Sequence, residues 1–331
     1  MLRYLSNSQI NYPEWDACIA ASGQPLVYAL SWYLDAVSPN WAGLVADQEG
    51  RYLAVMPLPE EKKMGIPFLR QPVVAQQLGL FARPGYGDTG GLLTRLLSQY
   101  ALISRYCFHT GNQQLSFPTD PNLQVQQQYT HHLDLSPPYE TLYRQYSRDR
   151  KLNLRRARQA GLQVLESQDI QPLICLFQAD AASRITGGVA EASYRILTDL
   201  YGRLQARGMA SLYYTQTAAG EWDAGCLFVR YAGQITYLFN AASVAGRPRN
   251  GRTLLIDRVI RAHAGQPYVL DFESPAAVAD IIRVYRGFNA LPVSFYSIQY
   301  NRLPAPVRWV KQARQFFYQK VLPARKPGLK A

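Results

Sequence analysis

The segment that starts at Asn240, NAASVAGRPRNGRT, combines residue types that bind phosphate. It joins a predicted strand to a predicted helix, and a helix N-terminus presents free backbone N–H groups and the positive end of the helix dipole to an anion. Arginines at this place would add charge-assisted hydrogen bonds. We therefore predict a phosphate site made by Arg247, Arg249, Gly251, Arg252 and Thr253. The competing interpretation is an ordinary capped helix behind a basic loop.

Two carboxylates follow on the next predicted strand. Asp271 and Glu273 belong to the sequence DFES, and residues two apart in an extended chain point to the same side. Either one could act as general base toward an amine. A structural role, with Asp271 capping the next helix and Glu273 in solvent, stays open.

Two tyrosines are the candidate proton donors. Tyr237 lies in the strand before the phosphate loop, and Tyr285 lies near the end of the helix that follows DFES. A tyrosine within hydrogen-bond reach can protonate a leaving thiolate or alkoxide. The chain has 23 tyrosines, so packing is the competing role for each of them.

Several familiar kinds of catalytic site lack their signatures. The sequence has no GxSxG, HExxH, GxxxxGK[ST] or GxGxxG motif. His131 and His132 are adjacent and would face opposite sides of a strand, while the other histidines are isolated. The four cysteines lie far apart, without a CxxC pair. We expect no metal and reduced, mostly buried thiols.

The hydrophobic patterns predict the elements that must position these residues. The predicted helices span 89–106, 139–160, 169–184, 190–207, 251–264 and 275–286. The predicted strands are a hairpin over 41–58 and the segments 113–118, 123–135, 209–217, 224–231, 234–241, 267–272 and 292–298. This order of elements predicts a mixed α/β (α+β) fold. A similar but less clear order of elements is predicted in the first half of the chain.

A length of 331 residues with 48% hydrophobic residues indicates a globular protein of roughly two domains, at about 150 residues each. We place the boundary at Pro137 and Pro138. The predicted units are 1–136, 137–300 and a basic C-terminal segment, 301–331.

The net charge of +12 is concentrated in two segments: residues 300–331 carry +8 and residues 141–160 carry +6. Such surfaces favour anionic partners such as a phosphate-rich cofactor, RNA or an anionic membrane. A continuous helix over 139–160 would place five basic residues on one face: Arg144, Arg148, Lys151, Arg155 and Arg158. A basic, aromatic helix over 304–320 is a candidate for contact with a membrane surface. The N-terminal residues have no apolar signal segment, so we expect a cytoplasmic location.

Three blocks of the chain resemble the Fem-like branch of the GNAT N-acyltransferase superfamily. They are WAGLVADQEGRYLAVMPLPEEKKMGIPFLRQPVVAQQLGLF at 41–81, RDRKLNLRRARQAGL at 148–162, and 251–298 with DFES and VYRGFNALPVSFYSI. The resemblance implies two tandem GNAT-like modules, the second being better formed. It also implies a donor that is either acyl-CoA, as in the acetyltransferases, or aminoacyl-tRNA, as in the Fem enzymes.

The resemblance carries over to particular residues. The GNAT pyrophosphate loop falls on Arg247 to Thr253, although Asn250 stands three positions after Arg247 where the family has glycine, and Thr253 stands two positions after Gly251 where it has glycine or alanine. The Fem-like DF-acid-Gly block corresponds to DFES, with serine in place of glycine. The aromatic-basic block corresponds to YRGF at 285–288, and RRARQAG corresponds to the basic helix where tRNA could lie in the tRNA-dependent members.

Together these features predict an N-acyltransferase that moves an acyl or aminoacyl group to an amine on a small molecule or a cell-wall precursor. The alternative is a non-catalytic protein on the GNAT scaffold that binds RNA or an anionic membrane surface.

Overall fold

The computed structural model describes residues 2–304, except 64, 88–90, 183–184, 186–187 and 276–277. The helices are α1 (Tyr12–Ala20), α2 (Ser31–Val37), α3 (Leu92–Gln99), α4 (Tyr139–Gln145), α5 (Arg148–Gln159), α6 (Gln171–Leu176), α7 (Glu191–Ala206), α8 (Gly251–His263) and α9 (Ala279–Arg286). Residues 305–331, which carry most of the predicted C-terminal helix, lie outside this part of the chain.

The strands form two sheets. They are β1 (Arg3–Ser6), β2 (Ala42–Gln48), β3 (Arg51–Leu58), β4 (Glu60–Lys63), β5 (Ile66–Arg70), β6 (Phe81–Ala82), β7 (Leu102–Cys107), β8 (Leu123–Asp134), β9 (Gln163–Glu166), β10 (Ala210–Gln216), β11 (Trp222–Tyr231), β12 (Gln234–Ala242), β13 (Val269–Asp271) and β14 (Leu291–Asn301). The first sheet has the order β1-β2-β3-β6, and the second has the order β4-β5-β7-β14-β8-β13-β12-β11-β10-β9.

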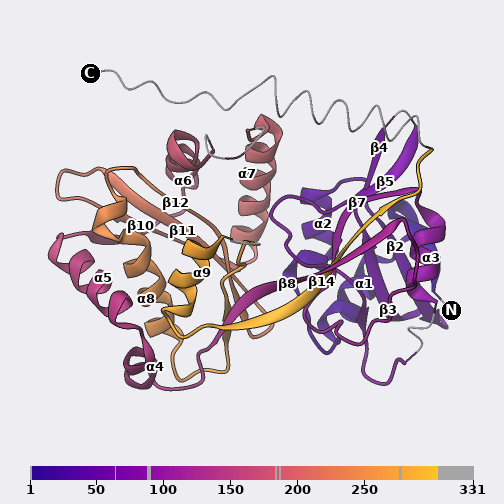
Figure 1. Cartoon of the computed structure of the whole chain (residues 1–331), viewed down its shortest axis with the longest axis horizontal. Coiled ribbons are helices and arrows are strands. Elements are labelled where there is room, and N and C mark those ends of the chain that lie inside the picture. The colour runs from indigo at the N-terminus through magenta and orange to yellow at the C-terminus, as the bar shows by residue number, and fades with distance from the viewer. Residues whose placement is uncertain are drawn as a thin grey trace.

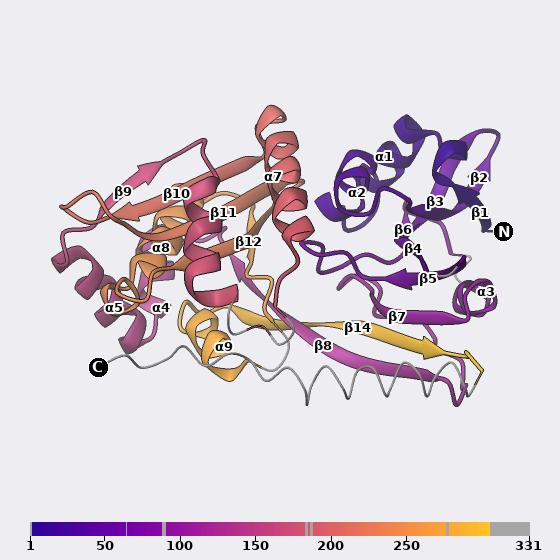
Figure 2. The ribbon, with the colours of Figure 1, turned by 90° about the horizontal axis from the view of Figure 1, so that it is seen from above.

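The second sheet runs through both halves of the molecule. β8 and β14 pair antiparallel from Leu291 opposite His132 to Tyr300 opposite Leu123. One end of β8 continues the sheet into β13, and the other end of β14 pairs with β7. Figures 1 and 2 show these two long strands crossing from one half to the other. The module boundary near residue 137 stays a prediction, and β14 contributes to both halves.

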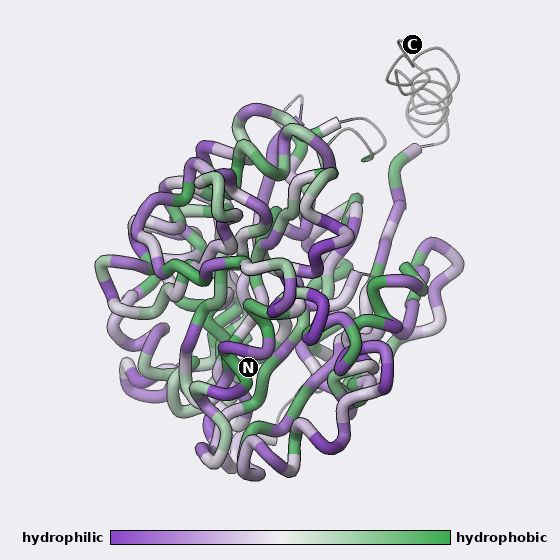
Figure 3. Tube along the Cα trace, turned by 90° about the vertical axis from the view of Figure 1, so that its left-hand side faces the viewer, coloured by the Kyte–Doolittle hydropathy of each residue, from purple (hydrophilic) through white to green (hydrophobic). Residues whose placement is uncertain are grey.

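Helices cover both faces of the strands β10 to β12. Residues of α6 and α7 belong to one buried apolar cluster with these strands, and residues of α8 and α9 belong to another. Because both faces are covered, β11 is buried along almost its whole length. α7 also contacts α2, so it helps to join the two halves. Figure 3 shows hydrophilic segments on many of the outer loops of the molecule.

The mixed α/β fold and most predicted elements are confirmed, including the hairpin β2–β3, the strands β10 to β12 and helix α8. The helix predicted over 89–106 is wrong beyond Gln99, because Leu102–Cys107 forms strand β7 between β5 and β14. Tertiary pairing overrides the local helical pattern here.

Two further predictions need correction. The strand predicted over 113–118 is absent, because this part of the chain forms a loop in which the Asn112 side chain bonds the backbone of Leu80. The helix predicted over 139–160 is two helices. The chain is extended at Tyr146, and Ser147 caps the second helix by accepting a hydrogen bond from the Arg150 N–H.

Candidate functional site

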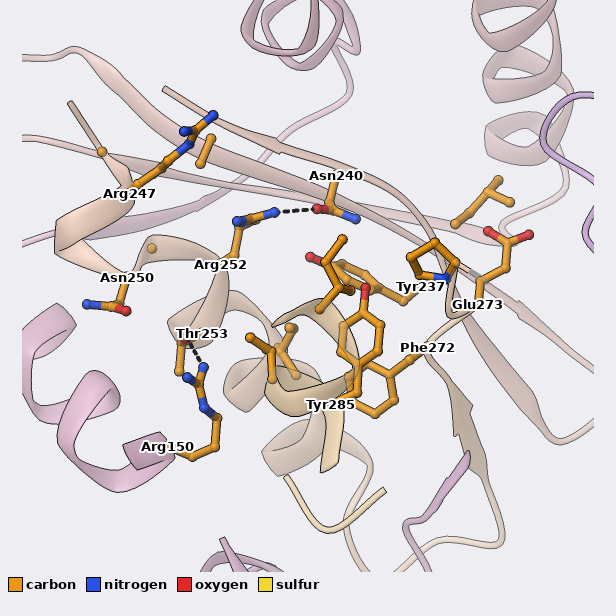
Figure 4. A pocket seen from close by; sticks show the side chains of 18 residues that line it. Arg150, Tyr237, Asn240, Arg247, Asn250, Arg252, Thr253, Phe272, Glu273 and Tyr285 are labelled. Atoms are coloured by element: carbon orange, nitrogen blue, oxygen red, sulfur yellow. Dashed lines mark hydrogen bonds between the residues drawn. The ribbon is translucent and has the colours of Figure 1, made fainter. Parts of the chain in front are cut away.

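A cavity of about 270 Å³ lies between β12, the N-terminus of α8 and helix α9. It forms because β12 pairs with β13 only from Gln234 to Thr236, while the other edge of β12 stays paired with β11 as far as Ala242. The sequence-predicted residues that line it are Tyr237, Arg247, Gly251, Arg252, Thr253, Glu273 and Tyr285. Figure 4 shows the arginines on one side, Glu273 on the other and the two tyrosines between them. Arg249 and Asp271 do not line this cavity.

Arg249 instead anchors the phosphate loop to the sheet. Its Nε lies 2.5 Å from Oδ1 of Asp223, a side chain with no exposed surface. A Cβ on Gly246 or Gly251 would come within 2.6 Å of the same carboxylate, so only glycine permits this close approach of loop and strand. Asn250 adopts the left-handed conformation (φ 61°) and turns the chain into α8.

We expect Arg249→Ala to destabilise the protein by about 2–3 kcal/mol, because it leaves the buried Asp223 carboxylate without its guanidinium. The estimate is below the usual cost of breaking a buried pair because Arg249 is itself 32% exposed. Urea unfolding measures the change, with the exposed Arg156→Ala as the control. A loss equal to that of the control would contradict this role.

Arg150 reaches the same cavity from α5 and was not among the predicted site residues. It is 9% exposed, its Nη1 donates to Oγ1 of Thr253 at 3.1 Å, and its guanidinium lies 5.8 Å from the Phe288 ring centroid. Burial lowers its pKa. No carboxylate lies within ion-pair distance of it in the described part of the chain. A buried cation without a carboxylate is unusual, since buried charges are normally paired.

A signal for Arg150 is present in the sequence. The buried positions of α5 are Arg150, Leu154 and Ala157, at the spacing of an amphipathic helix. An arginine at a helix position where the spacing predicts an apolar residue indicates that Arg150 is buried for a reason other than packing. Gly287 makes room for it, since a Cβ there would lie 2.6 Å from Cγ of Arg150.

The other two arginines of the loop have protein partners. Arg252 is exposed, and its Nη1 donates to Oδ1 of Asn240 at 3.0 Å. Arg247 forms an ion pair with Asp180. The positive side of the cavity therefore consists of Arg150, Arg252 and the first turn of α8, with Arg247 at its border.

Glu273 occupies a strained position at the opposite side. Its φ of 47° is in the left-handed region, so the chain after β13 is not extended there. Oε1 of Glu273 accepts a hydrogen bond of 2.8 Å from Tyr28, a residue of the N-terminal half. Burial, with a smaller contribution from the charge of nearby Asp271, raises the pKa of Glu273 to about 8, and the Tyr28 hydrogen bond opposes this rise. The carboxyl is therefore mostly protonated at neutral pH, and it becomes able to accept a proton as the pH rises above about 8.

The Asp271 carboxylate does not face the first cavity and is bound by neighbouring groups. The predicted side-by-side arrangement of Asp271 and Glu273 is not found, since Glu273 leaves the extended conformation. Oδ1 of Asp271 accepts hydrogen bonds from Oγ1 of Thr130 at 2.5 Å and from the Glu273 N–H at 2.9 Å. Its Oδ2 lies 3.4 Å from Nε2 of His132. Asp271 thus fixes the turn that presents Glu273.

The two tyrosines differ in their surroundings. The hydroxyl of Tyr237 lies 3.4 Å from Sγ of Cys226, and burial raises the pKa of Tyr237. Tyr285 stacks on Phe272 at 4.5 Å, and burial raises its pKa as well, against the effect of nearby Arg252. In the described part of the chain, no protein group bonds the Tyr285 hydroxyl, which Figure 4 shows directed toward the centre of the cavity.

A second cavity, of about 620 Å³, meets the first at Glu273, Leu238 and Pro275, which line both. Leu238 is the extra residue of a β-bulge, because Tyr237 and Phe239 pair with consecutive residues of β11. The second cavity is otherwise lined by residues of the N-terminal half, including Arg70, Gln76 and Arg105, by residues of β8, and by Ser274 and Phe295. Glu273 therefore lies where the two cavities meet.

The basic face predicted on one helix is divided between two. Arg144 is in α4, while Arg148, Lys151, Arg155 and Arg158 are in α5. Lys151 donates to the Arg144 carbonyl at 2.8 Å, and Arg158 lies 3.4 Å from buried Asp257. Arg148 and Arg155 are exposed. A role of these residues in binding RNA stays a prediction.

Residues 2–304, with the gaps given above, contain no group of three or more His, Cys, Asp and Glu side chains arranged to hold a metal ion. Over the same residues, no helix has both the length and the apolar composition that crossing a bilayer requires. Cys175 is exposed, and the other three cysteines are free and buried.

Neither a protein-family model nor a curated protein matches this sequence. Solved structures do match. FemX matches with a TM-score of 0.59 and 12% identity, over 96% of this chain and 100% of that one. A tandem GNAT protein from the clavulanic acid biosynthesis pathway, described as without AcCoA, matches with a TM-score of 0.56 and 11% identity, over 92% and 100%.

L-PGS from Bacillus licheniformis matches with a TM-score of 0.52 and 11% identity, over 91% of this chain and 96% of that one. At these identities the similarity is one of fold. The chain has the tandem GNAT fold of these structures, and the fold implied by the resemblance to the Fem-like branch is confirmed.

Proposed function

We propose that this protein is an N-acyltransferase that moves an acyl or aminoacyl group from a phosphate-bearing donor to an amine. The observation that carries the proposal is the place of Glu273, which lines both a second cavity and the cavity of Arg150, a buried arginine without an ion-pair partner among the described residues. A transfer reaction needs two substrates to meet at one proton acceptor, and this arrangement provides it.

The first cavity suits the donor. Arg150, Arg252 and the N-terminus of α8 would bind a phosphate or pyrophosphate group, with Thr253 holding the Arg150 guanidinium in place. Acyl-CoA and aminoacyl-tRNA both carry phosphate groups and an activated carbonyl, and in acyl-CoA the pantetheine arm separates the pyrophosphate from the carbonyl. The tandem GNAT structure described as without AcCoA makes acetyl-CoA the first donor to test.

The residues between the arginines and Glu273 would carry the chemistry. Glu273 would accept the proton of the amine as its nitrogen forms the new bond to the donor carbonyl carbon. The backbone N–H of Leu238, freed from the ladder by the bulge, is the candidate to bind the carbonyl oxygen. As the bond from carbon to the leaving sulfur or oxygen breaks, Tyr285 would donate its proton to that atom, with Tyr237 as the alternative donor.

Calorimetric titration of the full chain with acetyl-CoA, followed by an assay of thiol release with an amine mixture, tests this function. Micromolar binding and amine-dependent thiol release would support a CoA-dependent transferase. If acetyl-CoA does not bind, the same two experiments with aminoacyl-tRNA follow, and turnover there would support the tRNA-dependent reaction. Salt-sensitive RNA or vesicle binding without turnover of either donor would favour the non-catalytic alternative.

A further inference from the structure

We propose that the second cavity binds an amine that also carries an anionic group, a carboxylate or a phosphate, and that Arg70 and Arg105 bind that group. This inference rests on the proposed function, because it names the class of acceptor that would meet Glu273. It follows from the charges that line the cavity.

Arg70 and Arg105 form a like-charged pair across two strands. β5 and β7 run parallel, and their register places Arg70 opposite Arg105. Both side chains line the 620 Å³ cavity, so they share one face of the sheet. Like charges directly opposite each other destabilise a sheet. An anion bound between them would remove that repulsion.

Carboxylates in the described part of the chain neutralise the positive charge of Arg70 and Arg105 only weakly. Glu61 lies 3.6 Å from Arg70, but the two side chains are 48% and 60% exposed, so solvent screens the interaction. Arg105 has no carboxylate within ion-pair distance among the described residues. Its side chain interacts with the thiol of Cys107, whose pKa burial raises, so the charge of Arg105 is left for a ligand.

The other residues that line the second cavity indicate where the amine of the acceptor would bind. Glu273 is the one acidic residue among the described residues that line this cavity, and Gln71, Gln76 and Gln128 supply neutral polar groups. A volume of about 620 Å³ is within the range of small-molecule sites. A molecule that places its amine at Glu273 and its anionic group between Arg70 and Arg105 would complement the charged residues at the two ends of this cavity.

Matched pairs of acceptors test this proposal with the donor that supports turnover. Glycylglycine is compared with glycylglycinamide, which lacks the carboxylate, and O-phosphoethanolamine is compared with ethanolamine. We expect kcat/KM to favour the anionic member of at least one pair by about tenfold or more, and the pair that shows it identifies carboxylate or phosphate. In Arg70→Gln/Arg105→Gln the preference should fall to about threefold or less.

Arg51→Gln, an exposed arginine of β3 outside this cavity, should keep the wild-type preference. Absence of a preference in the wild type, or its survival in the double variant, would overturn the proposal.

If no donor supports turnover, the proposed function fails, and calorimetry with the same compounds alone still decides this inference. Binding of an anionic compound that is lost in the folded double variant supports the anion site. Equal binding by the wild type and the double variant, or no binding by either, rejects it.

Discussion

Glu273→Gln is expected to lower kcat/KM for acyl transfer by about 10²–10⁴-fold, because the amide cannot accept the proton of the attacking amine. The donor should still bind, since Arg150 and Arg252 on the opposite side of the cavity are unchanged. Steady-state kinetics together with donor titration separate the two effects. Full turnover by a folded Glu273→Gln protein would exclude this residue as the base.

The pH dependence of kcat/KM provides a second readout for the same residue. Burial raises the pKa of Glu273 to about 8, so the carboxyl is protonated and inactive as a base below that pH. We expect kcat/KM, expressed per unprotonated amine, to rise with pH to a plateau above about 8, and this ascending limb should disappear in Glu273→Gln. Tyr28→Phe removes a hydrogen bond that favours the carboxylate, so it should move the limb to higher pH.

The raised pKa of Glu273 also makes the stability of the folded protein depend on pH, because folding buries the charged carboxylate. The pKa of Glu273 is higher in the folded protein than in the unfolded chain, whose ordinary value is 4.5. The folded state therefore loses stability relative to the unfolded state as pH rises from about 4.5 to about 8. Glu273→Gln should reduce this loss, which denaturant unfolding at both ends of the range measures.

Asp271→Asn distinguishes the two carboxylates. Asp271 holds the backbone N–H of Glu273 and raises the pKa of Glu273 through its charge. If Glu273 is the base, Asp271→Asn should retain an ascending limb, shifted to lower pH. Loss of the limb in Asp271→Asn, with the limb retained in Glu273→Gln, would assign the base to Asp271 instead.

Arg150→Gln is expected to weaken donor binding by about 10–100-fold, because a hydrogen bond to a charged group contributes about 1.5–3 kcal/mol. The variant should be as stable as the wild type or more so, because the folded protein buries this cation without a carboxylate in the described residues. Weaker binding combined with undiminished stability is the behaviour of a ligand-binding residue rather than a structural one.

Arg156→Gln is the matched control, since Arg156 belongs to the same helix and is exposed. Calorimetric titration with the donor and urea unfolding measure both properties in both variants. If Arg150→Gln binds the donor as tightly as Arg156→Gln does, Arg150 has no part in the donor site.

Local sequence determined the strand, loop and helix that line the proposed phosphate site. Alternating and helical patterns identify β12 and α8, and the glycines and arginines between them identify the loop, because each of these signals comes from residues within one or two turns of each other. The same local reasoning placed Glu273, Tyr237 and Tyr285, which the fold brings to one cavity.

Local sequence was misleading where distant segments decide the conformation. Leu102–Cys107 continues a helical pattern, yet it becomes a strand because β5 and β14 pair with its two edges. The spacing of Asp271 and Glu273 predicts a shared direction, but the turn at Glu273 separates them. In both places contacts with other segments outweigh a local preference of a few tenths of a kcal/mol per residue.

By itself the sequence thus determined the fold class, and it identified the loop that we propose to bind phosphate and two candidate bases, Asp271 and Glu273. Tertiary structure alone decided that Arg150 enters the cavity, that Arg249 anchors the loop, and that Tyr28 reaches Glu273 from 245 positions away. The physical reason is the range of the interactions. Periodicity and turn chemistry act between near neighbours, whereas the partner of a buried charge is set by the packing of segments that meet only when the chain folds.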